Sequence, residues 1–326
     1  MKTLMRATIG LAFGAALLWL AVSRVDLTEV RSLLSAARPG LMLLSLGLYW
    51  ISLAVRIVRW RVLLSATCAL SFLQVAHGLV VGYAVNNILP ARLGEIFRAD
   101  YLRRRYGVAR AAALGSIIVE RLLDALTVFA LLAFGLLTAK LKDNQPVLDA
   151  AAWFASIAIG CGIIFVIVAV FWRDRLRLDR WPWLGDRFAV LAQAMSIVHR
   201  PVMLLAVIAS LVVWAFEAGA LYLIMRGFGI DIGIPGLCLI LGTAAFSTLL
   251  PSAPGYVGSL QVAYIVTFSA LGVAPVFAVV VSTSMQVLLL GSVTVGGLAI
   301  YLADELYRGV LFVKNEKKVR PSGPSA

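Results

Sequence analysis

Three charged residues lie within one apolar stretch of this sequence. Glu120, Arg121 and Asp124 interrupt the run 111–138, which is otherwise apolar and long enough to cross a bilayer. In a helix, Glu120 and Asp124 share a face, and Arg121 and Asp124 are close enough to pair, which leaves Glu120 in need of another partner. Charges inside a membrane are costly and by default mark function, although a cluster that ties helices together is the alternative.

Helix-breaking and polar residues cut two other apolar stretches. The first break contains Asn86, Asn87, Pro90, Arg92, Gly94 and Glu95, with Arg98 one turn beyond. The second contains Pro251, Pro254, Gly255 and Gly258, with Ser259 and Gln261 directly after. Broken backbone at membrane depth is tolerated only where protein buries it or where it lines a polar cavity. Paired breaks of this kind in two halves of a chain indicate a transport site.

The residues at the first break suggest phosphate binding. Arg92 lies beside Pro90 and Gly94, where freed backbone N–H groups could join its guanidinium around an anion. Anchoring of Arg92 to anionic lipid is the alternative interpretation. Asn86 and Asn87 are predicted to cap the broken helix ends or to face a polar cavity, because an unpaired amide is costly there.

Two further features complete the candidate site. A half-helix that begins near Ser259 would direct its positive N-terminal end at a bound anion. Glu217 lies within the apolar run 201–225 and is expected to pair with Arg121 or to contact a cationic head group. No nucleophile, metal-ligand, nucleotide-binding or haem motif is present, so the sequence predicts neither an enzyme nor a cofactor.

The composition identifies a membrane protein. Of 326 residues, 62% are hydrophobic and only 14% are charged, whereas soluble domains are about half apolar and a quarter charged. The net charge of +13 does not indicate nucleic-acid binding, because the basic residues lie in short loops beside apolar runs, where they set topology and meet anionic lipid.

Charge then fixes the expected topology. The runs able to cross are 7–23, 40–55, 111–138, 150–172, 201–225 and 275–303. If the interrupted segments also crossed, the arginines of 92–110 and 173–200 would lie outside, against the positive-inside bias. If 72–110 instead enters and leaves from the cytoplasm, and 234–272 from outside, most basic residues become cytoplasmic.

The predicted fold is therefore an all-α polytopic membrane protein. It has six full transmembrane helices, two oppositely inserted re-entrant helical hairpins and both termini in the cytoplasm, an arrangement that suggests an inverted repeat. Residues 1–313 form one membrane domain, and 314–326 form a basic tail that we expect to be disordered. The segment 27–37 is expected to lie as an amphipathic helix at the outer surface.

Residues 86–125 and 251–261 resemble the transmembrane region of lysylphosphatidylglycerol synthases and its stand-alone relatives, the flippase-like domain proteins. The matching elements are Asn86-Asn87, Pro90, Arg92, Gly94-Glu95, Arg98, Val119-Glu120-Arg121, Asp124, Pro251 to Gly258 and Gln261. With similar length and hydropathy, the resemblance covers nearly the whole chain. Gln261 falls where many members have Glu, which weakens the case for a cationic head-group site at that position.

The resemblance implies lipid handling. In the fused family members this region is thought to move an aminoacylated phospholipid to the outer leaflet; without a soluble aminoacyl-transferase domain, this chain is not expected to make lysyl lipid. We expect a flippase for a phospholipid or lipid-linked head group in a bacterial-type inner membrane. The alternatives are a membrane enzyme of polyprenyl-linked sugar or isoprenoid lipid metabolism, and an accessory subunit of a separately encoded synthase or glycosyltransferase.

Overall fold

The computed structural model describes residues 26–89, 93–141, 201–248 and 253–319, with the isolated positions 16, 18, 19, 23, 153, 156, 157, 160, 164 and 197. Every regular element in these ranges is helical. The expected crossings 7–23 and 150–172 lie almost wholly outside the described residues. The sequence prediction of an all-helical fold is confirmed for the described part of the chain.

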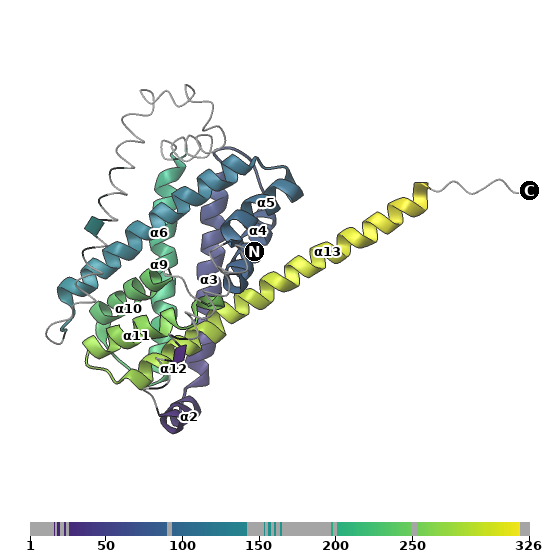
Figure 1. Ribbon diagram of the computed structural model, residues 1–326. Coiled ribbons are helices and arrows are strands. Elements are labelled where there is room, and N and C mark those ends of the chain that lie inside the picture. Colours follow the sequence, from purple (N-terminus) through teal and green to yellow (C-terminus); the bar gives the residue numbers. More distant parts are fainter. Residues whose placement is uncertain are drawn as a thin grey trace, which may run out of the picture.

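Two long antiparallel helices form the centre of the bundle. They are α3 (Pro39–Leu64) and α9 (Val202–Gly227), which lie side by side in Figure 1. Their direction is fixed by two contacts: the Arg38 N–H, just before α3, donates to Gly227 O at the end of α9, and the Ser52 hydroxyl, midway along α3, donates to Val213 O, midway along α9. The short helix α2 (Leu27–Ser35) precedes α3 and is capped by the Asp26 carboxylate.

The first interrupted segment is a helical hairpin. Its arms are α4 (Phe72–Ile88) and α5 (Gly94–Tyr106). A Cβ atom on Gly82 would lie 2.5 Å from the Arg98 side chain, and one on Gly78 would lie 3.0 Å from Leu102. These contacts run in opposite senses along the two helices, so the arms are antiparallel. Because Gly82 has no side chain, α5 can approach α4 closely and the Arg98 side chain fits against the Gly82 backbone.

The second interrupted segment is also a hairpin. Its arms are α10 (Gly233–Ser247) and α11 (Ser259–Ala270), joined through the short 3₁₀ helix η4 (Pro254–Tyr256). The hydroxyls of Thr243 and Thr267 are 2.8 Å apart and tie the arms together. As predicted, the second half-helix begins at Ser259.

The two hairpins enter the bundle from opposite ends. At one end, Arg61 near the end of α3 donates to Leu70 O just before α4. The helix α6 (Arg110–Thr138) begins at the same end, where Trp60 donates to Ser116. At the other end of α6, Thr138 lines one cavity together with Pro235 and Leu271, which flank the open end of the second hairpin.

Each hairpin packs against the long helix that follows the other one. The last turns of α6 lie on α10, where a Cβ on Gly135 would be 2.6 Å from Leu239 N. In the same way α13 (Gly291–Val319) lies on α4, where a Cβ on Gly297 would be 2.6 Å from Val80 O. Both halves therefore share the order helix, hairpin, helix, with exchanged packing partners.

The last long helix is interrupted by a π-helical turn. α12 (Pro275–Met285) continues through η5 (Gln286–Leu290) into α13, which leaves the bundle in Figure 1. The boundary predicted between the membrane domain and the tail, at residue 314, falls inside this helix, and residues 320–326 lie outside the described part of the chain. π-turns of this kind are frequently found at functional sites.

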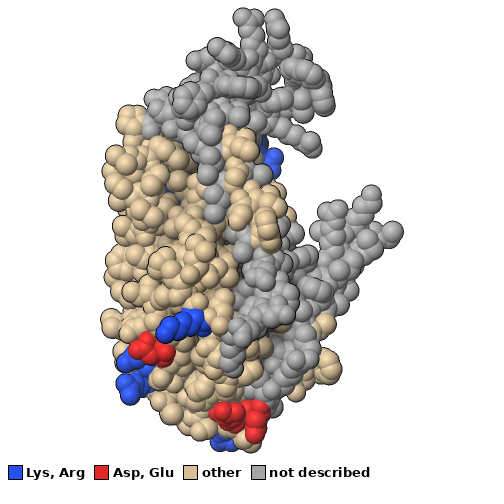
Figure 2. Space-filling view, turned by 90° about the vertical axis from the view of Figure 1, so that its left-hand side faces the viewer, with Lys and Arg blue, Asp and Glu red and all other residues tan. Residues whose placement is uncertain are grey.

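Three of the described helices are long and apolar enough to cross a membrane: Pro39–Leu64, Val202–Gly227 and Pro275–Tyr307. Figure 2 shows a face whose described surface is free of Lys, Arg, Asp and Glu over most of its area, with most of the visible charge near one end. α3 is longer than predicted, since it continues past residue 55 to Leu64. As a result Arg56 and Arg59 lie inside the helix rather than in a loop.

Candidate functional site

Eight charged side chains from four helices form one cluster inside the bundle. They are Arg56 and Arg59 of α3, Glu95 and Arg98 of α5, Glu120, Arg121 and Asp124 of α6, and Glu217 of α9. We call this set the ion-pair cluster. Its four guanidinium groups balance its four carboxylates, so the cluster carries no net formal charge.

The fully buried Glu120 has two arginine partners. Arg98 reaches it with both terminal nitrogens, at 2.7 Å and 3.3 Å, and Arg59 Nη2 lies 3.5 Å away. The Arg98 guanidinium also stacks on Trp60, 3.6 Å from the ring centroid. A planar guanidinium suits both contacts, which a lysine would not reproduce. Arg98 and Arg59 are therefore the further partners that the sequence indicated Glu120 needs.

Asp124 is the other acidic centre. It accepts hydrogen bonds from Arg59 and from the Trp214 indole, and Arg121 Nη1 lies 3.5 Å away, as the helical spacing predicted. Arg56 Nη1 completes the surroundings at 3.7 Å. Because these partners come from α3, α6 and α9, the carboxylate joins three helices.

Glu217 pairs with a residue that sequence reasoning did not assign to it. Arg56 Nη2 donates to Glu217 Oε1 at 2.7 Å, and the Ser52 hydroxyl is 3.4 Å from the same oxygen. The predicted partner, Arg121, instead lies beside Glu95. The prediction failed because α9 packs on α3, which brings Glu217 to the arginines of that helix.

Arg121 and Glu95 form the least buried edge of the cluster. Their side chains are 33% and 24% exposed, whereas the other cluster side chains are at most 14% exposed. Arg121 Nε lies 2.7 Å from Glu95 Oε1, yet the N–H is not aligned on that oxygen as a hydrogen bond. This edge joins α6 to the first turn of the hairpin arm α5.

The two asparagines of the first break have separate roles. Asn86 Oδ1 accepts the Gly94 N–H at 2.7 Å and so caps the start of α5, as predicted. Asn87 donates to Thr294 Oγ1 and to Leu290 O, which ties the hairpin tip to the helix after η5. Of the two roles predicted for Asn87, capping a helix end or facing a polar cavity, the described residues show neither; the side chain instead contacts α13 and the π-turn directly.

The second break is held by two glutamine side chains. Gln261 Oε1 accepts the Gly258 N–H, and Gln261 Nε2 donates to Gln286 Oε1 of the π-turn. Gln286 Nε2 in turn donates to Gly255 O, so the tip backbone is satisfied through η5. Pro254 begins the turn and Gly255 takes a positive φ of 68°, a conformation that glycine adopts without strain.

The tips of the two hairpins touch. A Cβ on Gly255 would lie 3.8 Å from Asn87 O, and η4 packs on α4. Tyr256, beside Gly255, has a φ of 61°, which is uncommon for a residue with a side chain. Within the described residues the two tips therefore make a closed contact.

Arg92 lies outside the described residues, as do Pro90 and Pro251. Sequence reasoning also missed three members of the site: Arg56, Arg59 and Gln286. Arg56 and Arg59 directly follow the predicted run 40–55 and were counted among the basic residues that set topology from short loops. Their three-residue spacing on one helix face, next to Trp60 and aliphatic residues, was the available signal.

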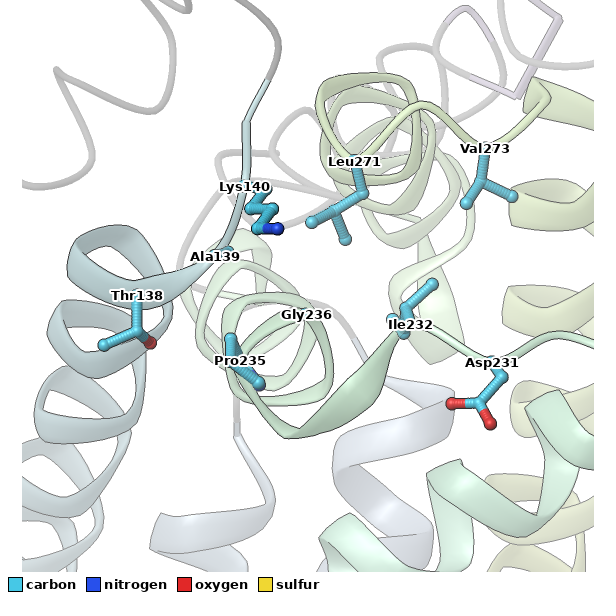
Figure 3. A pocket seen from close by; sticks show the side chains of 9 residues that line it. All are labelled: Thr138, Ala139, Lys140, Asp231, Ile232, Pro235, Gly236, Leu271 and Val273. Carbon is cyan, nitrogen blue, oxygen red and sulfur yellow. The ribbon is translucent and has the colours of Figure 1, made fainter.

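One surface cavity lies away from this cluster. It has a volume of about 390 Å³ and is bordered by the end of α6, the start of α10 and the turn after α11. Figure 3 shows Lys140 reaching across toward Leu271, with Pro235 and Asp231 on the opposite wall. None of the predicted site residues lines this cavity.

A bundle of apolar helices, two opposed hairpins and buried ion pairs define an integral membrane protein with broken helices. The chain belongs to the family described as the lysylphosphatidylglycerol synthase TM region, whose sequence model matches residues 7–297. The family predicted from the motifs is confirmed, and the chain is a multi-pass membrane protein.

Three curated relatives are similar to this chain. A UPF0104 membrane protein of Methanothermobacter thermautotrophicus is 25% identical over 76% of the chain and 80% of the relative. Glycosyltransferase AglD of Haloferax volcanii is 25% identical over 77% of the chain, but only 46% of AglD is covered. A UPF0104 membrane protein of Pyrococcus horikoshii is 29% identical over 41% of each chain. No solved structure matches.

Proposed function

We propose that this protein is a flippase that moves the phosphate-bearing head group of a phospholipid or lipid-linked substrate between the leaflets of a membrane. The observation that carries the proposal is the ion-pair cluster, which lies inside an apolar bundle and includes one hairpin arm. Ionised groups are retained in such a place when they serve a pathway for charge. The acyl chains would stay in lipid while the head group crosses.

We further propose six crossing helices and two re-entrant hairpins, with both termini in the cytoplasm of a bacterial-type cell. Entry of the hairpins from opposite ends of the bundle supports this topology, as does the antiparallel pair α3 and α9. The repeated helix–hairpin–helix order supports an inverted repeat. Such repeats commonly alternate access by rocking one half against the other.

Within this scheme the arginines bind phosphate. Arg121 is the member that a head group can reach, because it is the most exposed guanidinium of the cluster. Arg92 is proposed as a second phosphate ligand. Glu95, Glu120, Asp124 and Glu217 balance charge or hold an amine. Without a nucleotide-binding motif, we propose that movement is downhill or coupled to an ion gradient.

Reconstitution tests the proposal. Purified protein is placed in vesicles that contain a fluorescent anionic phospholipid, and dithionite access measures how fast the label changes leaflet. The wild type should exceed empty vesicles, and Arg121→Ala should return the rate toward that baseline. Asp231→Asn serves as the control, because it removes a charge outside the ion-pair cluster, at the open end of the second hairpin. Equal rates for wild type, Arg121→Ala and empty vesicles would defeat the proposal.

The similarity to a glycosyltransferase favours a second candidate. The chain matches 46% of AglD. On this basis it would serve polyprenyl-linked sugar or isoprenoid lipid metabolism, either as an enzyme or as a subunit of a separately encoded synthase or glycosyltransferase. Mg²⁺-dependent turnover of a radiolabelled lipid-linked sugar by purified protein would indicate an enzyme. Copurification of a glycosyltransferase would indicate a subunit. Our leading proposal is that the chain has no catalytic activity.

A further inference from the structure

We infer that Glu95 is an internal substitute for the substrate's phosphate: its carboxylate occupies the position on Arg121 that a lipid phosphate takes when it binds. This inference rests on the proposed function. It assigns a specificity-determining role to a residue that the proposed function uses only to balance charge or to hold an amine.

Charge balance is the first argument. The ion-pair cluster has four guanidinium groups and four carboxylates, so a phosphate that simply added to it would introduce uncompensated negative charge. In a low-dielectric interior an uncompensated charge is strongly unfavourable. A phosphate can enter without this cost if one carboxylate leaves as it arrives.

Exposure identifies the carboxylate that leaves. Glu120 is fully buried, and the side chains of Asp124 and Glu217 are 9% and 14% exposed, whereas Glu95 is 24% exposed. Glu120 and Asp124 each have two or more arginine partners, while Glu95 has one among the described residues. Glu95 is therefore the carboxylate that is released with the least loss.

The geometry of the Arg121 pair agrees with exchange. Arg121 Nε is a buried donor, and although Glu95 Oε1 lies 2.7 Å away, the N–H does not point at it as a hydrogen bond requires. The contact is thus an attraction between charges without the aligned fork that arginine forms with its best partners. A phosphate, with its tetrahedral oxygens, can offer the aligned acceptor.

The Glu95 carboxylate remains stabilised after it leaves Arg121. Glu95 is in the first turn of α5, where the helix N-terminus favours negative charge. When phosphate displaces Glu95, the arm α5 loses its contact with Arg121 of α6. Head-group binding would thereby loosen the first hairpin from α6, which couples recognition to movement of the hairpin.

The test compares full-length variants in uncharged detergent. Glu95→Gln removes the competing charge. Asp100→Asn is its matched control, because Asp100 is on the same helix and pairs with an arginine outside the cluster, Arg110. Binding is measured for dioctanoyl phosphatidylglycerol, farnesyl phosphate and inorganic phosphate, so that a phospholipid, a polyprenyl-type phosphate and a free anion are distinguished. Melting curves check folding, and Glu95→Asp, which keeps the charge but shortens its reach, is a second variant.

Glu95→Gln should bind the recognised lipid phosphate about tenfold more tightly than the wild type, since a charge-assisted competitor has been removed. Glu95→Asp should lie between them, Asp100→Asn should match the wild type, and Glu95→Gln combined with Arg121→Ala should lose the gain. Unchanged or weaker binding by a folded Glu95→Gln, with lipid transport intact in the wild type, overturns the inference alone. Absence of both binding and transport in the wild type overturns the proposed function as well.

Discussion

Glu120 and Asp124, one turn apart on α6, share the guanidinium of Arg59. Arg59 Nη1 lies 2.6 Å from Asp124 Oδ1, and Nη2 lies 3.5 Å from Glu120 Oε1. Two carboxylates so close would repel each other in an apolar bundle, and the guanidinium between them turns that repulsion into a link from α6 to α3. The side chain of Arg59 is fully buried, and its charge is tolerated in the apolar bundle because these two carboxylates compensate it.

Asp124→Asn should destabilise the protein strongly. Loss of this carboxylate leaves the four guanidinium groups of the cluster with only three carboxylates, and breaking a buried pair in this way costs about 3–5 kcal/mol. We expect a clear drop in the melting temperature in detergent. The matched control is Asp231→Asn, whose partner Arg226 is exposed, and which should change stability by less than about 1 kcal/mol. Similar melting temperatures for both variants would show that the cluster adds no stability.

The close helix contacts give a second prediction. Gly242→Ala would place a Cβ 2.6 Å from the Leu132 Cβ, and Gly297→Ala would place one 2.6 Å from Val80 O. Overpacking of this kind costs about 1–3 kcal/mol, so both variants should melt earlier. Gly47→Ala is the control, because nothing lies within 4 Å of its added Cβ and alanine favours the helix. A drop for Gly47→Ala as large as for the other two would contradict these contacts.

The elements of this fold could be predicted well from the sequence, because hydropathy and breaks report local chemistry. The hairpin arms begin at Phe72 and Ser259 as expected, and the prolines and glycines at 251–258 do form a turn where they are described. The predicted length of α3 was wrong, because the apolar run 40–55 was ended before Arg56 and Arg59, whereas the helix continues to Leu64. Buried charge is indistinguishable from loop charge until its partners on other helices are known.

The pairing of the site could not be predicted for the same reason. Asn86 was predicted correctly as a cap because its partner, Gly94, is near in sequence. Glu217 and Gln286 were not, since their partners lie far away along the chain and depend on how α3, α9 and the π-turn pack. Local hydrogen bonds are encoded by spacing, whereas contacts between helices follow from the tertiary packing.

If the two hairpins enter the membrane from opposite sides, their open ends should be labelled from opposite sides. In a variant without native cysteines, Arg104→Cys lies at the open end of the first hairpin and Asp231→Cys lies at that of the second. Both positions are exposed, so both should react. In intact cells a membrane-impermeant maleimide should label only Asp231→Cys, and permeabilisation should be needed for Arg104→Cys. Labelling of both positions from one side would contradict the proposed topology.

Cross-linking tests whether the first hairpin must move. Asn87 Nδ2 and Thr294 Oγ1 are 2.9 Å apart, so cysteines at both positions should form a disulfide that fixes the tip of the hairpin to α13. If head groups cross by parting of the hairpin from the bundle, oxidation should stop lipid movement and reduction should restore it.

The matched control is the cysteine pair at Thr243 and Thr267, whose hydroxyls are 2.8 Å apart within the second hairpin. Because α10 and α11 belong to one hairpin, a disulfide there constrains no motion between the hairpins and the long helices. Oxidation should therefore leave the rate of lipid movement close to that of the wild type. Equal inhibition by both disulfides would indicate that rigidity in general slows transport, and unchanged transport in the first pair would mean that the hairpin tip stays on α13 throughout.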